Sequence, residues 1–139
     1  MSLSIRNQIP GTVVSVTPGE VMATVKVRLY GGQEITAAIT LEAVKELGLA
    51  AGSSVRTLIK STEVALATGA IEGLSIRNRI PGTITEVTTG GAMAGVKVTV
   101  AGGELTAAIT KDAVTDLGLA AGSSVIALIK STEISLASV

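Results

Sequence analysis

Apolar and polar residues alternate from Val21 to Tyr30, and this period of two predicts a β-strand with one buried face. Gly31 and Gly32 then predict a hairpin turn. The stretch from Glu34 to Thr40 is expected to return beside the first strand. The side chains predicted to point inward are Val21, Ala23, Val25, Val27 and Leu29 on the first strand and Ile35, Ala37 and Ile39 on the second.

One short helix is predicted between Thr40 and Gly48, because Thr suits the N-cap and Gly suits the position after the last helical turn. Residues 9–12, Ile-Pro-Gly-Thr, predict a turn, followed by a strand over residues 12–17. Two more strands are predicted over residues 54–60 and 63–67. On the outer face of the penultimate strands we expect an inter-domain or subunit interface, formed by Leu58, Ile126 and Leu128.

The chain repeats itself. Residues 3–67 align with residues 74–137, with one deletion near Gln33 and 44 identical pairs among 64 aligned positions. This indicates a tandem duplication, with domains at residues 1–69 and 70–139 and a short linker at residues 68–73. The predicted fold is mainly β: two tandem OB-like five-stranded β-barrels, each with one short α-helix. Because each half is small for an independent core, we expect oligomerisation to contribute stability.

Composition excludes several classes of function. The 139 residues carry 11 basic and 11 acidic side chains, with no Cys, no His and Tyr30 as the one aromatic residue. Thiolate or imidazole metal sites and Ser-His-Asp chemistry are therefore absent, which argues against an enzyme. Single-stranded nucleic acid needs a basic groove and stacking aromatics, so it is an unfavourable partner. No signal peptide or membrane-spanning run is recognisable, and we expect a cytoplasmic protein without a membrane partner.

The recurring polar segments are the candidate site. Leu-Ser-Ile-Arg-Asn opens each repeat and Leu-Ile-Lys-Ser-Thr-Glu nearly closes it. A surface arginine and a lysine at a strand end are commonly just solvated charges. Together with hydroxyl and amide donors, however, they suit a small oxyanion. Thr40 and Thr110 are most simply helix N-caps, a role compatible with an anion beside the free N–H groups.

These segments resemble the Mop domain in their order and spacing. The resemblance rests on the Ser-x-Arg-Asn opening, the Gly-Thr strand, the Ala-Ala-Ile-Thr strand end before a Leu-Gly-Leu helix, and the Lys-Ser-Thr-Glu ending, all present twice. It covers essentially the whole chain, which is similar to di-Mop molybdate-binding proteins. The chain departs from the family at Ile5 and Ile76, where relatives commonly have a small residue, and at Met22 and Met93, where many relatives have a polar one.

The resemblance implies a homotrimer with six Mop units that binds molybdate or tungstate at interfaces between units, for storage and homeostasis. No side chain would coordinate the metal directly. Carried over by position, the oxyanion-binding residues are Ser4, Arg6, Asn7, Thr40, Lys60 and Ser61 in the first repeat, and Ser75, Arg77, Asn78, Thr110, Lys130 and Ser131 in the second.

Molybdate offers only acceptor oxygens, so a shell made only of donors should favour it over hydrogen phosphate, which carries a proton. This expectation weakens if Glu63 or Glu133 lines the site. The alternative function is a structural or regulatory oligomerisation module without its own ligand.

Overall fold

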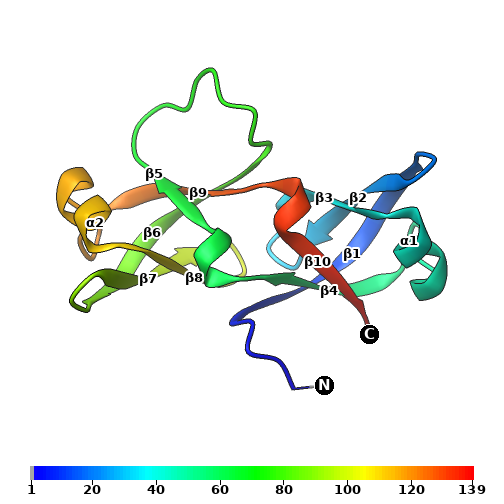
Figure 1. Cartoon of the computed structure of the whole chain (residues 1–139), viewed down its shortest axis with the longest axis horizontal. Helices are drawn as coiled ribbons and strands as arrows, with labels where there is room; N and C mark the ends of the chain where they lie inside the picture. Colours follow the sequence, from blue (N-terminus) through cyan, green and yellow to red (C-terminus); the bar gives the residue numbers. More distant parts are fainter. Residues whose placement is uncertain (1) are drawn as a thin grey trace.

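The computed structural model describes residues 2–139 and shows two lobes side by side, each built on a curled antiparallel sheet of five strands (Figure 1). The first repeat forms β1 (Asn7–Pro18), β2 (Met22–Leu29), β3 (Glu34–Thr40), α1 (Leu41–Leu47), β4 (Ser54–Ile59), the 3₁₀ turn η1 (Ser61–Glu63) and β5 (Ala65–Ala67). The second forms β6 (Asn78–Thr89), β7 (Met93–Val100), β8 (Gly103–Thr110), α2 (Lys111–Leu117), β9 (Ser124–Ile129), the 3₁₀ turn η2 (Ser131–Glu133) and β10 (Ile134–Ser138).

The prediction of a mainly β chain with one short helix in each half is confirmed. Along β2, buried and exposed residues alternate strictly, as expected for a strand with one face in the core. Val21 is an error in the predicted inward set: it lies before β2 and its side chain is 73% exposed. Thr40 and Thr110 cap the helices, each hydroxyl accepting from the backbone N–H three residues later, and Gly48 adopts the left-handed conformation that ends α1.

The sheets do not coincide with the repeats. Their strand orders are β10-β4-β1-β2-β3 and β5-β9-β6-β7-β8, so each repeat gives its last strand to the other repeat's sheet. In Figure 1, β10 (red) lies beside β4 in one lobe, and the short β5 (green) lies in the other. Each predicted domain therefore contributes four strands to one sheet and one strand to the other, which differs from the expected pair of self-contained barrels.

The turn predicted at residues 9–12 is wrong, because β1 runs through it without interruption. Pro10 is tolerated because the pairing of β1 with β2 starts only at Gly11, so no ladder bond needs the missing N–H. Gly11 is required by close packing: a Cβ there would lie 2.7 Å from a methyl carbon of Val27 and 2.9 Å from the carbonyl oxygen of Arg28. Pro10 and Gly11 therefore lie within a continuous strand and do not reverse the direction of the chain. Gly11 is needed there because the neighbouring strand leaves no room for a side chain.

The core is continuous across both lobes and consists of aliphatic side chains. Leu58 and Leu128, predicted on an outer face, are each only 6% exposed, so the chain itself covers them. Residues 68–77, which connect the two repeats, form a loop without helix or strand that runs from β5 to β6 of the same sheet and projects from that lobe (Figure 1). Among residues 2–139, no helix has the length and apolar character needed to cross a membrane.

Two buried asparagines join the lobes. Asn7, at the start of β1, receives a hydrogen bond from the backbone N–H of Thr106 (2.8 Å) and donates one to the carbonyl oxygen of the same residue (2.8 Å). Asn78, at the start of β6, makes the same pair of bonds with Thr36 (2.8 and 2.9 Å). Thr36 and Thr106 lie on the edge strands β3 and β8. Each amide therefore occupies backbone groups that an edge strand would otherwise leave unpaired.

Candidate functional site

The sheet register brings the two candidate segments of each repeat together. Asn7 pairs with Ile59 across β1 and β4, and the strands are antiparallel, so Arg6 and Lys60 meet where these strands end. In the other sheet Asn78 pairs with Ile129, which sets Arg77 beside Lys130 in the same way. The sheet thus joins polar motifs that lie far apart in the sequence.

In the first repeat this convergence forms a pocket of about 230 Å³, which we call the Lys60 pocket. Four of its lining residues belong to the predicted site, and they come from the N-terminal segment and from the start of η1. The full lining is Ser4, Ile5, Arg6, Lys60, Ser61 and Thr62.

The donors of the Lys60 pocket are only partly engaged. Arg6 donates from Nε to the carbonyl oxygen of Ser4 and from a terminal nitrogen to that of Leu3, each at 3.1 Å in an exposed position. The hydroxyl oxygen of Ser61 is buried and has no hydrogen-bond partner in the described chain. Because buried hydroxyls are normally paired, this orphan oxygen fits a ligand or water in the pocket.

The second repeat forms a different pocket, of about 260 Å³, which we call the Lys130 pocket. It takes residues from both repeats, and of the predicted site residues only Lys130 lines it. Ser75, Arg77 and Ser131 do not. Its lining is Thr62, Glu63, Val64, Ala65, Ile76, Ala108, Ile109, Leu128 and Lys130. Glu63 therefore faces this pocket, so the donor-only argument for discrimination against phosphate does not hold here.

The two asparagines have a different environment from the other predicted ligands. Asn7 and Asn78 are each only 3% exposed, and both polar atoms of each amide already bond to backbone. Asn78 Nδ2 also lies 3.4 Å from the hydroxyl oxygen of Ser131. Each asparagine directly follows an arginine in the sequence. Its hydrogen bonds join the start of β1 to β8, or the start of β6 to β3, next to the pockets.

Thr40 and Thr110 are not brought to these pockets. Thr40 lies at the C-terminal end of β3, in a surface hollow with Glu20, Glu42, Lys45 and Glu46. Its hydroxyl accepts from the N–H of Ala43 at 3.1 Å, and Thr110 does the same with Ala113. In a single chain both threonines act as helix caps.

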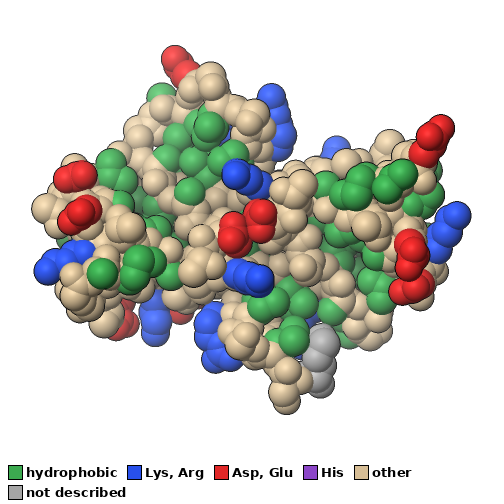
Figure 2. All heavy atoms as spheres, viewed as in Figure 1, with side chains coloured by type: hydrophobic (Ala, Val, Ile, Leu, Met, Phe, Trp, Pro, Cys, Tyr) green, Lys and Arg blue, Asp and Glu red, His purple; other side chains and the backbone are tan. Residues whose placement is uncertain are grey.

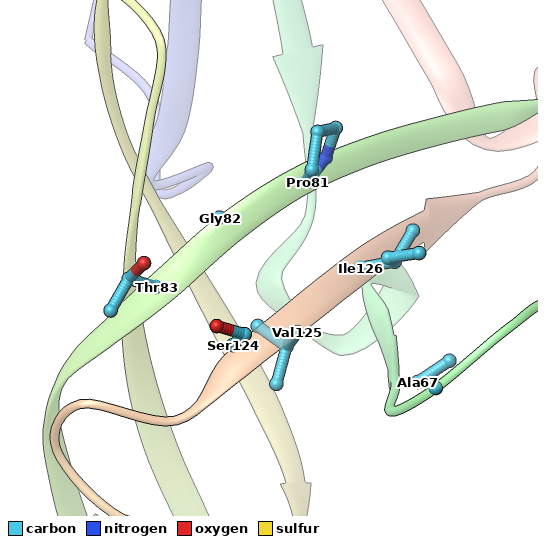
Figure 3. Close-up of a pocket in the computed structure, with 8 residues that line it drawn as sticks. Ala67, Pro81, Gly82, Thr83, Ser124, Val125 and Ile126 are labelled. Atoms are coloured by element: carbon cyan, nitrogen blue, oxygen red, sulfur yellow. The ribbon is translucent and has the colours of Figure 1, made fainter.

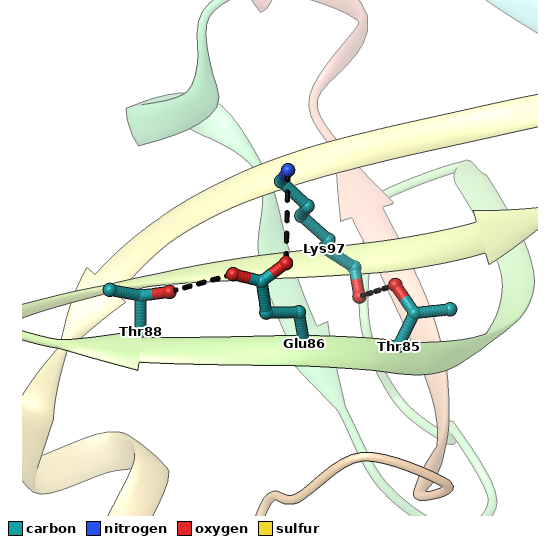
Figure 4. Close-up of polar contacts among 4 residues, drawn as sticks. All are labelled: Thr85, Glu86, Thr88 and Lys97. Atoms are coloured by element: carbon teal, nitrogen blue, oxygen red, sulfur yellow. Dashed lines mark hydrogen bonds and ion pairs between the residues drawn. The ribbon is translucent and has the colours of Figure 1, made fainter.

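The pocket cations Arg6, Lys60 and Lys130 have no carboxylate partner within ion-pair distance among residues 2–139. The ion pairs in residues 2–139 are Arg28 with Glu34 at 3.2 Å and Lys97 with Glu86 at 3.8 Å. Figure 4 shows the second pair, in which Thr88 also donates to Glu86 at 3.2 Å. Neither pair includes a cation of the two pockets, which leaves those charges available to an anion.

A larger hollow of about 540 Å³ lies beside the exchanged strand β5, but its chemistry is unsuited to an anion. Figure 3 shows Pro81, Gly82 and Thr83 of β6 facing Ser124 to Ile126 of β9, with Ala67 at the side. No charged residue lines it. Within residues 2–139 there is likewise no cluster of three acidic, Cys or His residues that would hold a metal cation.

Sequence reasoning missed two contributors. Thr62 lines both pockets. The sequence offers a signal for it, because this threonine belongs to the recurring Lys-Ser-Thr-Glu segment. Arg79 donates to the carbonyl oxygens of Ile76 (3.0 Å) and Leu74 (2.8 Å), which holds the segment that opens the second repeat. Its counterpart Gln8 makes only one such bond, to Ile5 at 3.0 Å.

Known proteins share both the sequence and the fold. The molybdenum transport protein ModE of Herbaspirillum seropedicae is 38% identical over 139 residues, 99% of this chain and 52% of that protein. The molybdenum-pterin-binding protein MopB of Rhodobacter capsulatus is 41% identical over 136 residues, 96% of this chain and 50% of its own length. The chain thus spans about half the length of these curated relatives.

One solved structure matches from end to end. The cytoplasmic molybdate-binding protein ModG, in a form with molybdate bound, has a TM-score of 0.96 and 39% sequence identity, and the match covers 100% of both chains. The family model described as the TOBE domain matches residues 3–66 and again residues 74–136. The chain therefore belongs to the TOBE-domain family as a tandem pair of such domains, which confirms its predicted resemblance to di-Mop proteins.

Proposed function

We propose that this protein binds molybdate or tungstate and serves as a cytoplasmic store of the oxyanion. The observation that carries the proposal is the full-length similarity to ModG with molybdate bound, combined with the donors gathered in the Lys60 pocket. Relatives described as molybdenum-pterin-binding proteins support a binding function over an enzymatic one.

The proposed ligands are the charged and hydroxyl donors of the polar motifs. An oxyanion with four acceptor oxygens is satisfied by a guanidinium, an ammonium, hydroxyls and backbone N–H groups. In the first repeat these are Ser4, Arg6, Lys60 and Ser61, and in the second Ser75, Arg77, Lys130 and Ser131. Asn7 and Asn78 support them from behind, while Thr40 and Thr110 would join a shell only where another copy of the chain meets the helix ends.

A homotrimer is the proposed assembly. Apolar side chains remain exposed next to the helices, among them Val21 at 73%, Met22 at 45% and Met93 at 47%. Exposed apolar groups of this kind favour contact with another subunit. The second repeat's donors, which the single chain does not close into one pocket, would be completed at such contacts.

Native mass spectrometry with and without molybdate tests the assembly and the ligand together. A trimer that gains several oxyanion masses is the expected result. An oligomer that gains none would instead support a structural or regulatory module, and a monomer that binds nothing would contradict both assembly and storage. Competition calorimetry with phosphate and sulfate then measures selectivity.

A further inference from the structure

The exchanged strands bring a carboxylate to each lysine. Ala65 of β5 pairs with Leu128 of β9, and continuing this antiparallel register by two residues sets Glu63 beside Lys130. In the other sheet Ile134 pairs with Ile59, which sets Glu133 beside Lys60. Extended beyond the strand ends, the register thus places each lysine between the arginine of its own repeat and the glutamate of the other repeat.

The pocket lining agrees with this register for Glu63, which faces the same pocket as Lys130, whereas Glu133 is placed opposite Lys60 by the register alone and does not line the Lys60 pocket. Figure 2 shows acidic side chains at the middle of this face, around η1 and η2, with basic side chains on either side. Both glutamates are half-buried, and neither forms an ion pair within the described residues 2–139. The Glu63 carboxylate therefore lies at the Lys130 pocket without forming an ion pair with the lysine.

A carboxylate at this place affects oxyanions differently. A fully deprotonated dianion presents only acceptors, so a nearby carboxylate repels it and can accept nothing from it. Hydrogen phosphate carries an O–H group and can donate it to the carboxylate, which offsets part of the repulsion. One negative charge beside the lysine thus changes both the affinity and the selectivity of the pocket.

We propose that Glu63 and Glu133 determine affinity and selectivity, each acting on the pocket of the repeat that does not encode it. Their charge keeps the affinity for molybdate low enough for reversible release and reduces the preference for molybdate over hydrogen phosphate. This inference rests on the proposed oxyanion function and names two residues that the donor set omits.

Titration calorimetry on the full-length chain tests the inference with Glu63→Gln and Glu133→Gln. Each substitution removes the charge and keeps the side-chain size. We expect molybdate to bind about tenfold more tightly, the scale of removing one like charge near the protein surface. Phosphate affinity should rise less or fall, so that the molybdate-to-phosphate ratio increases.

Glu72→Gln is the matched control, because it removes the same charge from the exposed loop at residues 68–77 and should leave both affinities unchanged. Molybdate affinities of Glu63→Gln and Glu133→Gln that equal those of Glu72→Gln would overturn the inference. Lys130→Ala and Lys60→Ala separate this failure from failure of the proposed function: if they too bind as tightly as the unmodified chain, the site itself is misplaced. Thermal melts verify folding, and the two glutamates, one in each sheet, provide independent tests.

Discussion

The two repeats carry nearly identical polar motifs, yet their arginines make different contacts, and only Arg6 lines a pocket with the lysine of its repeat. In the first repeat Arg6 itself donates to the carbonyl oxygens of Leu3 and Ser4. In the second repeat Arg79 takes over this task, and Arg77 makes no side-chain hydrogen bond within residues 2–139. The repeats differ at the position after the motif, which is Gln8 in the first copy and Arg79 in the second. Because Arg79 makes the backbone contacts in the second copy, the Arg77 guanidinium is free within the described residues, whereas the Arg6 guanidinium is engaged.

The serines differ in the opposite direction, because the first-repeat serine is the one without a partner in the described chain. Ser131 accepts a hydrogen bond from Asn78 at 3.4 Å, which leaves its own O–H free to donate, whereas the Ser61 oxygen has no partner. An anion must supply the first partner of Ser61 but only the second partner of Ser131. The comparison shows that duplicated motifs can form two unequal sites once their surroundings diverge.

The largest effect is expected from the asparagines that hold both pockets in place. Asn7→Ala or Asn78→Ala leaves a backbone N–H and a carbonyl of an edge strand unpaired, which should cost about 2–4 kcal/mol of unfolding free energy. Asn78→Ala should cost slightly more, because it also loses Ser131. Urea denaturation measures the difference. The exposed Gln8→Ala is the control, and equal stability of all three variants would contradict the clamping role.

The next largest effect is on oxyanion affinity. Lys60→Ala and Lys130→Ala should each weaken binding at one class of site by about 1.5–3 kcal/mol, roughly ten- to a hundredfold, the range for a charge-assisted hydrogen bond. Calorimetry should resolve one weakened class and one unchanged class in each variant. A uniform loss at all sites would indicate that the two pockets form a single site.

Ser61→Ala and Ser131→Ala test the inequality of the hydroxyls. Each should weaken molybdate binding by about 0.5–1.5 kcal/mol, the net value of a neutral hydrogen bond. Without ligand, Ser61→Ala should not lower the melting temperature, because it removes an unpaired buried oxygen. Destabilisation of the ligand-free protein by Ser61→Ala would show that this hydroxyl already has a partner in solution.

The smallest effect comes from exchanging the residues that distinguish the repeats. Gln8→Arg should relieve Arg6 of its exposed contacts and strengthen the first site, and Arg79→Gln should weaken the second, each by about 0.5 kcal/mol or less for such solvent-exposed groups. Opposite signs in the two variants are the result that matters. Changes of the same sign would contradict this assignment, because neither the arginine contacts nor the added and removed positive charge predicts them.

The local patterns along the sequence are sufficient to predict most of the strands and both helices. Alternation along β2 and the Thr and Gly at the ends of α1 predicted a strand and a helix, because burial and capping depend on neighbours in sequence. The same patterns wrongly predicted a turn at residues 9–12. Gly11 is needed there because β2 packs closely against β1, and Pro10 is tolerated because the pairing with β2 begins only at the next residue. They also grouped Asn7 with the ligands, although its amide is occupied by Thr106 across the lobes.

The duplication, the mainly β class and the recurring cationic motifs follow from the order of residues alone. Which repeat supplies the fifth strand of each sheet becomes known only from the folded chain. The physical reason is that Val64 and Ile134 occupy equivalent positions in near-identical segments, so Ile59 can pair with either in the same register. Which of the two pairs with Ile59 depends on the path that η1 and η2 take between the lobes. The same path places Glu63 in the pocket that contains Lys130.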